Sequence, residues 1–152
     1  LIDARYVFKG MRKKPEVMEK VFWKLGDQIL KYMELVKEYG GDLISYADSS
    51  GGVNILGPKM MEDVTVNFTY PFLKKVEQLA DDKTMILLCP KTTLALIGTE
   101  KAKFVDHQLE EPIGYAQACI HMIGKAHFAG QMCIKNVGYQ LNHGIFKEVK
   151  LL

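Results

Sequence analysis

The chain has 152 residues, 48% of them hydrophobic, which is enough to bury one ordinary core. Its 20 Lys and Arg residues nearly balance 18 Asp and Glu residues, so we expect neither nucleic acid nor a membrane as a partner. The apolar runs are far shorter than the roughly 20 residues of a membrane span. No secretory leader is visible, and three scattered cysteines suit a reducing cytoplasm, where we expect the protein to reside. Because the first residue is Leu, we expect further residues in front of it.

The first half of the chain predicts two helices separated by a strand. Apolar residues recur at helical spacing over residues 15–39, and Gly40 fits the stop after that helix. The run DLISYA (42–47) predicts a short strand, followed by a Ser-Gly loop. A second amphipathic helix is predicted over 59–80, with a kink or break near its middle because Pro71 lacks the helical donor.

The second half alternates strands with helices. Strands are predicted at 84–89, 102–107 and 127–136, and helices at 92–98, 112–125 and 140–152.

This order of elements predicts an α/β fold in which about four parallel strands alternate with helices. A complete (β/α)8 TIM barrel needs about 250 residues, so four units make about half of one. Three arrangements remain open: a fragment of a larger barrel, two copies that close a barrel, or an open doubly wound sheet. We favour the fragment, with residues 1–152 forming one partial barrel domain.

Parallel α/β folds gather their functional residues where strands run into the following loops. The predicted strands bring Asp48, Cys89, Asp106 with His107, and Asn136 to one such face. Simpler interpretations exist: Asp48 bonds backbone amides in a turn, and Cys89 is a small buried apolar residue. No strong metal motif is present, and a pair of Cys89 and His107 on neighbouring strand ends lacks further zinc ligands.

The segment from about Gly10 to Val149 resembles the uroporphyrinogen decarboxylase superfamily, above all its methylcobamide:coenzyme M methyltransferase branch. The matching motifs, in chain order, are Pro15-Glu16, Gly41-Asp42, Asp48, Gly57-Pro58, Pro71-Phe72-Leu73-Lys74, MILLCPKTT and IKNVGYQLNHGIFKEVK. The loop Asp48-Ser49-Ser50-Gly51-Gly52 is similar to the Asp-Pro-x-Ala-Ser loop of the methyltransferases.

The resemblance implies a TIM barrel and a site in which zinc, held by a His-x-Cys pair and a later Cys, activates a thiol such as coenzyme M. A corrinoid protein would supply the methyl group. Cys89 retains the Cys position, but Leu87 stands where the family has His, and Pro90 replaces the family Gly. His107 is a candidate substitute ligand for zinc.

Three functions follow from the resemblance. In the leading one, a methyltransferase, Cys89 and Asp48 are catalytic, and Asp48, Ser49, Ser50 and Asn136 shape the pocket for substrate or corrinoid. The second is a metal-free decarboxylase of a tetrapyrrole or similar carboxylated substrate. The third is a divergent, non-catalytic barrel that binds a corrinoid or a partner protein.

Overall fold

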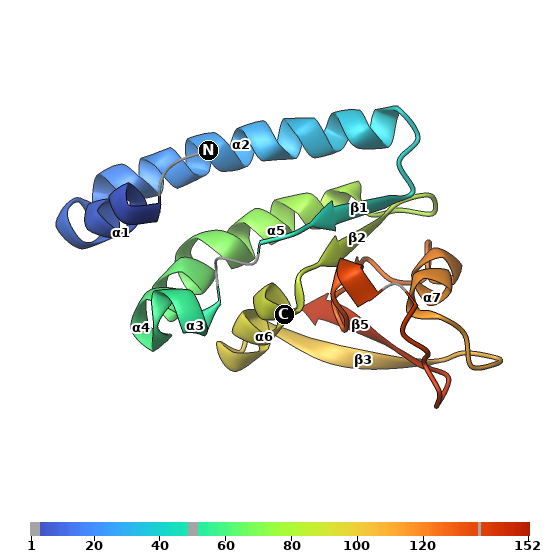
Figure 1. Ribbon diagram of the computed structural model, residues 1–152. Coiled ribbons are helices and arrows are strands. Elements are labelled where there is room, and N and C mark those ends of the chain that lie inside the picture. Colours follow the sequence, from blue (N-terminus) through green and yellow to red (C-terminus); the bar gives the residue numbers. More distant parts are fainter. Residues whose placement is uncertain (1–3, 49–51, 137) are drawn as a thin grey trace.

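The computed structural model describes residues 4–48, 52–136 and 138–152, and these form a mixed α/β fold (Figure 1). The α-helices are α1 (Ala4–Lys13), α2 (Pro15–Glu38), α3 (Val53–Leu56), α4 (Pro58–Val64), α5 (Tyr70–Val76), α6 (Pro90–Gly98) and α7 (Tyr115–His121). A π-helix, η1 (Thr65–Thr69), joins α4 to α5, and 3₁₀ turns lie at η2 (Glu77–Leu79) and η3 (Ile134–Asn136). The strands are β1 (Leu43–Tyr46), β2 (Met85–Leu88), β3 (Ala102–Gln108), β4 (Phe128–Ala129) and β5 (Ile145–Leu151).

The described strands form a single sheet in the order β1-β2-β4-β5-β3. The first three are parallel neighbours, with Tyr46 opposite Leu88 and Ile86 opposite Phe128. β5 runs antiparallel to both β4 and β3, and its pairing with β3 extends over seven residue pairs. The sheet is therefore mixed, with β1 and β3 at its two edges.

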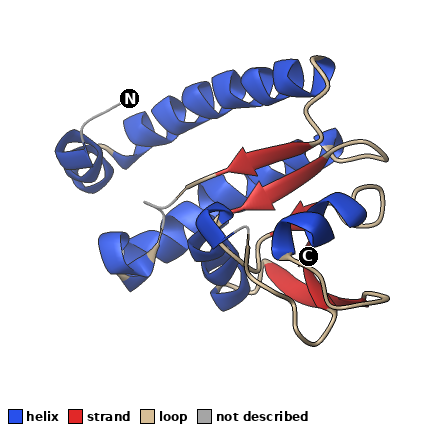
Figure 2. Ribbon diagram, turned by 45° about the vertical axis from the view of Figure 1, so that its right-hand side comes forward, coloured by secondary structure: helices blue, strands red, loops and turns tan. Residues whose placement is uncertain are grey.

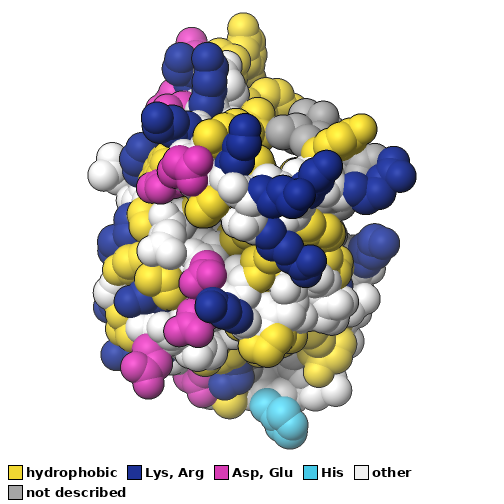
Figure 3. All heavy atoms as spheres, turned by 90° about the vertical axis from the view of Figure 1, so that its left-hand side faces the viewer, with side chains coloured by type: hydrophobic (Ala, Val, Ile, Leu, Met, Phe, Trp, Pro, Cys, Tyr) yellow, Lys and Arg dark blue, Asp and Glu magenta, His cyan; other side chains and the backbone are white. Residues whose placement is uncertain are grey.

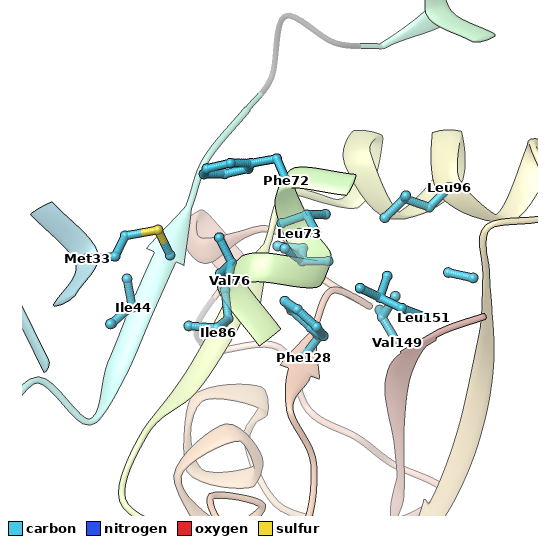
Figure 4. Close-up of a cluster of buried hydrophobic side chains, with 12 residues drawn as sticks. Met33, Ile44, Phe72, Leu73, Val76, Ile86, Leu96, Phe128, Val149 and Leu151 are labelled. Atoms are coloured by element: carbon cyan, nitrogen blue, oxygen red, sulfur yellow. The ribbon is translucent and has the colours of Figure 1, made fainter. Parts of the chain in front are cut away.

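Apolar residues cover both faces of the sheet because each strand sends alternate side chains to opposite sides. On one face, Ile86 and Leu88 pack with α2, α5 and α6 in the core cluster drawn in Figure 4. On the other face, Met85 and Leu87 pack with α7. The prediction of burial on both sides is thus confirmed for the central strands β2 and β4, which explains the uninterrupted apolar run of β2, whereas much of the edge strand β3 is exposed.

The long helix α2 and the strand that follows it agree with the sequence prediction. Pro15 fixes the first turn, where its missing N–H has no role, and Gly40 ends the helix with a φ of +85° that other residues rarely adopt. β1 then returns alongside α2 in the opposite direction (Figure 2). No helix among the described residues has both the length and the apolar composition to cross a membrane.

The predicted break near Pro71 is present as a change of helix type. The backbone passes from α4 into the π-helix η1 and back into α5, and Pro71 lies in the first turn of α5. Pro71 has no backbone N–H to donate, and the change of hydrogen-bond register in η1 lies directly before it.

The predicted final helix is wrong, since residues 145–151 form β5. Phe146 enters the α7-side core, while Val149 and Leu151 enter the core on the opposite face. The apolar spacing of this segment also fits a helix, so periodicity alone did not separate the two states. The seven-residue pairing with β3 decides for the strand.

Two further boundaries differ from the prediction. The strand predicted over 127–136 stops after Ala129, because Gly130 lies under Thr93 and β5 occupies the next place in the sheet. The helix predicted over 112–125 is shortened to α7, because a β-bridge between Gly114 and Gln140 holds its start extended. The expected sheet of about four parallel strands is therefore corrected: the described strands form a five-stranded mixed sheet.

Candidate functional site

The carboxyl ends of β1 and β2 bring two predicted site residues together. The strands pair in parallel up to Tyr46 and Leu88, and the backbone N–H of Cys89 then donates to the Tyr46 carbonyl at 3.2 Å. Asp48 and Cys89 thus leave the sheet from neighbouring strands at the same edge. This edge leads into the loop before α3 and into the first turn of α6 (Figure 1).

The loop after β1 is fastened to α6. The Thr92 hydroxyl, on a buried residue in the first turn of α6, donates to the backbone carbonyl of Asp48 at 3.1 Å. Further along, a Cβ added to buried Gly52 would lie 2.8 Å from the Asn54 Oδ1 and 3.2 Å from the Lys91 Cδ, so a larger residue here requires these side chains to move. Ser49 and Ser50, predicted to bind substrate, lie outside the described residues.

Tyr46 lies at this edge as well, although the sequence pattern did not predict it as a site residue. Its half-buried ring packs against Phe72 with centroids 5.6 Å apart. Burial first, and the negative charge of Asp48 second, raise the pKa of the Tyr46 phenol well above its usual range. The phenol therefore remains a proton donor next to a carboxylate. Its position as the last residue of β1, two residues before Asp48, was the available signal.

Cys89 is half-buried and precedes Pro90, the first residue of α6, with an extended backbone of φ −65° and ψ 135°. Its side chain makes no capping hydrogen bond to that helix, so the thiol is not committed to a structural cap. Leu87, two residues earlier, is 2% exposed and belongs to the core beneath α7. A metal ligand at the Leu87 position would therefore face that core.

The prediction that His107 lies on a strand next to Cys89 is wrong. β4 and β5 lie between β2 and β3, and three strand steps of about 4.8 Å amount to roughly 14 Å. The end of β3 lies beside α7 instead, where His107 helps to line a groove of about 860 Å³. The His107 Nε2 is 2.9 Å from the Glu148 carboxylate, which orients the ring across β5. Asp106 is likewise removed from the site and pairs with Lys147 at 2.8 Å.

Asn136 does not lie at a strand end. It is exposed in the turn η3, where its N–H donates to the Cys133 carbonyl at 2.8 Å and its own carbonyl accepts from Tyr139 at 2.9 Å. Because β4 ends at Ala129, the chain reaches Asn136 only after leaving the sheet. The sheet edge therefore unites Asp48 and Cys89, but not Asn136.

The donor set at this edge does not fit zinc. Structural and catalytic zinc sites in proteins use at least three protein ligands. Within the described residues, no three His, Cys, Asp or Glu side chains come together to hold a metal. Cys89 occupies the place of one family ligand, Leu87 cannot bind zinc, and His107 is too distant to complete the set.

A groove of about 990 Å³ lies next to this edge rather than on it. Its walls come from α1, the start of α2, α4 and η1, and they include three methionines and two phenylalanines: Met11, Met18, Met60, Phe22 and Phe68. Residues Leu56 to Met60, which follow the Asp48 loop, form one side. Neither Asp48 nor Cys89 lines the groove.

The α/β sheet places a carboxylate, a phenol and a thiol at the ends of two parallel strands, the edge at which proteins of this fold class commonly bind ligands. The sequence profile of uroporphyrinogen decarboxylase (URO-D) matches residues 1–111, which extend from α1 past the end of β3. The chain therefore belongs to the uroporphyrinogen decarboxylase family. No curated protein and no solved structure shows significant similarity to it.

The matched region includes Asp48, Cys89 and His107 and excludes Asn136. Family membership thus covers the two residues that the sheet edge brings together. It does not distinguish the methyltransferase branch from the decarboxylases.

Proposed function

We propose that the protein is a methyltransferase-like member of the family, which moves a methyl group from a methylated corrinoid on a partner protein to a small thiol such as coenzyme M. The observation that carries this proposal is the juxtaposition of Cys89 and Asp48 at the ends of neighbouring parallel strands, with Tyr46 beside them. Open α/β sheets bind their ligands at this edge.

In the proposed reaction the thiol substrate must lose its proton, because the thiolate is the nucleophile. Asp48 accepts that proton, directly or through a water. The sulfur electron pair then forms the bond to the methyl carbon, and the pair of the broken cobalt–carbon bond stays with the donor's cobalt. Tyr46, whose raised pKa keeps its proton in place, donates a hydrogen bond to the substrate.

In this proposal Cys89 lines the substrate pocket, and its thiol contacts the substrate sulfur. The described residues do not fit the zinc that the family resemblance implies, and no step of the proposal passes through it.

A second candidate is decarboxylation of a carboxylated tetrapyrrole, which needs no metal. Its supporting observation is Leu87, which replaces the family zinc ligand with a buried apolar side chain. Asp48 and Tyr46 would then act on a carboxylated ring system at the same edge.

The test supplies methylcobalamin and 2-mercaptoethanesulfonate to the full-length protein and follows methylated thiol by chromatography. We expect Asp48→Asn to lower the rate roughly 100-fold, the size of a lost general base, while Asp42→Asn, on the exposed residue before β1, leaves it unchanged. Cys89→Ser is expected to lower the rate and the matched Cys133→Ser to leave it unchanged.

Loss of carboxyl groups from a porphyrinogen, with no methyl transfer, would replace the first candidate with the second. Binding of a corrinoid without either reaction would leave a non-catalytic binding protein. Zinc content per chain is measured on the same preparation, and a metal that Cys89→Ser removes would show that ligands beyond the described residues complete a site.

We also propose that β1, β2 and β4 are consecutive strands of the family's TIM barrel. Their parallel order, with α2, α5 and α6 on one face, supports this assignment. The antiparallel β5 and the cover that α7 gives the opposite face are departures from a barrel. An experimental structure of the full-length protein tests it: further strands that pair with β1 and close the sheet would support the assignment, and a sheet left open at β1 would overturn it.

A further inference from the structure

Positive charge is unevenly distributed along the chain. Residues 4–14, which form α1 and the turn after it, hold five of the 20 Lys and Arg residues and none of the 18 Asp and Glu residues. The rest of the chain carries 15 cations against 18 acids. The small net charge of the whole protein therefore conceals a strongly basic segment on an otherwise slightly acidic molecule.

Four of these cations are available to a partner. Lys9, Arg12 and Lys13 follow one another at helical spacing on α1, and Lys14 comes directly after the helix. All four are exposed, and none of them forms an ion pair with a described residue. Elsewhere four lysines pair with carboxylates at 2.6 to 3.7 Å. We call Lys9, Arg12, Lys13 and Lys14 the α1 basic face.

The opposite side of α1 is fixed to α2. Val7, Phe8 and Met11 are half-buried, and a Cβ added to Gly10 would lie 2.5 Å from the Met18 sulfur, so the two helices are in close contact there. Three apolar side chains that a membrane-binding helix would insert into lipid are thus partly buried, and Tyr6 is the large hydrophobic side chain of α1 that stays exposed. The basic face is held outward on a fixed scaffold.

The α1 basic face lies at the end of the molecule to which β1 and β2 point (Figure 1). Figure 3 looks onto this end and shows Lys and Arg side chains gathered across its upper half. Lys59, which lines the same groove as Arg12, and Lys91, on α6 beside the Asp48 loop, continue the basic character toward the strand-end site. Glu16, Glu19 and Asp63 line the same groove as Arg12 and Lys59, so the groove itself carries both signs of charge.

We propose that the α1 basic face docks the acidic surface of a partner protein and holds that partner beside the edge formed by Asp48 and Cys89. This inference rests on the proposed function, in which a protein delivers the methyl donor. A folded partner with a local acidic patch can contact the basic face alone. A long polyanion such as RNA would also meet the acidic remainder of the chain.

The probe is a corrinoid protein loaded with methylcobalamin, and its binding to the full-length protein is measured by calorimetry. Docking through charge predicts a Kd that rises with salt, since ions screen exposed charges over about 10 Å at 0.1 M. We expect Lys9→Glu/Arg12→Glu/Lys13→Glu to raise the Kd about tenfold or more and to remove most of its salt dependence. The matched control Lys83→Glu/Lys125→Glu/Lys150→Glu makes the same charge change on exposed residues elsewhere and is expected to keep the original Kd.

A second variant guards against a folding defect. Lys9→Gln/Arg12→Gln/Lys13→Gln removes the charges without adding acids, and we expect an intermediate Kd with an unchanged Tm. Turnover is measured in parallel with free methylcobalamin as donor, where neither α1 variant should change the rate.

Equal Kd values for the α1 variants, the control and the unmodified protein would overturn the docking surface, whatever the protein catalyses. Loss of binding to phosphatidylserine vesicles or to a 20-nucleotide RNA, with the corrinoid-protein Kd retained, would overturn it in favour of those partners. Absence of methyl transfer from either donor would instead refute the proposed function, while the Kd comparison still decides the docking surface.

Discussion

The hydroxyl of Thr92 donates a hydrogen bond of 3.1 Å to the backbone carbonyl of Asp48. This contact joins the residue Asp48 after β1 to the first turn of α6, which follows the neighbouring strand β2 and lies 44 residues further along the chain. It fixes the position of the loop that carries the candidate catalytic carboxylate. Thr92 therefore acts on Asp48 as a positioning residue.

Thr92→Val keeps the shape of the buried side chain and removes this hydrogen bond. We expect the free energy of unfolding to fall by about 1 kcal/mol, the typical net value of one such bond. Amide hydrogen exchange after β1 should accelerate by more than the global loss explains. Thr92→Ser retains the hydroxyl but loses a buried methyl group, so it should lose some global stability while its exchange after β1 is not accelerated beyond that loss. Equal exchange in the Val and Ser variants would contradict the positioning role.

Gly130→Ala tests the packing that ends β4. An added Cβ would overlap the Thr93 hydroxyl oxygen and lie 2.9 Å from a Val149 methyl group. We expect a loss of about 1–3 kcal/mol in the free energy of unfolding, as in other overpacked cores. Gly98→Ala, at the open end of α6, should instead stabilise the protein by about 0.5–1 kcal/mol. Urea unfolding measures both variants.

Thr93→Ala in the Gly130→Ala background gives the control. The Thr93 hydroxyl is buried without a hydrogen-bond partner among the described residues, so its removal costs little and relieves the overlap. We expect the double variant to be more stable than Gly130→Ala alone. A double variant that is less stable would show that the clash is not the cause.

The Asp81–Lys37 pair predicts a pH-dependent contribution to stability. The Lys37 ammonium lies 2.6 Å from the Asp81 carboxylate, and its hydrogen bond, followed by those from the Lys83 and Thr84 backbone, lowers the pKa of Asp81. Because the pKa is lower in the folded state, the stabilisation is present above the unfolded value near 4 and is lost as the pH falls through the folded value.

Asp81→Asn should therefore lower the urea midpoint at pH 7 and have a smaller effect below about pH 4. Asp82→Asn, on the exposed neighbouring carboxylate, serves as the matched control and should leave the midpoint unchanged at both pH values. The same difference between Asp81→Asn and the unmodified protein at both pH values would exclude the charge as its source.

Cys119 should be the least reactive cysteine. It is 1% exposed, and burial raises its pKa to about 11, whereas Cys89 and Cys133 are half-buried. Since the pKa is higher in the folded state, this thiol stabilises the fold below about pH 9 and loses that contribution as the pH rises toward 11. Ellman's reagent at pH 8 should label two thiols quickly and the third at the rate of unfolding. Rapid labelling of all three would contradict the buried position.

The candidate site was predicted in part. Asp48 and Cys89 were placed correctly at strand ends because a carboxylate or thiol directly after a short apolar run is a local pattern. Tyr46 was overlooked because its sequence position is that of an ordinary strand residue. Its raised pKa arises from burial, where the ring packs against Phe72, and from the negative charge of Asp48. His107 was also correctly placed near a strand end, but the order of the strands could not be read from the chain.

The sequence alone determined the elements whose signals are local: the α2 helix with its Pro start and Gly stop, the apolar strands β1 and β2, and membership of the family. Strand order, the direction of β5 and the end of β4 were decided only by the tertiary structure. The apolar spacing of residues 145–151 is compatible with a helix and with a strand, and pairing with β3 selects the strand. That pairing depends on contacts some 40 residues apart, which local propensity does not encode.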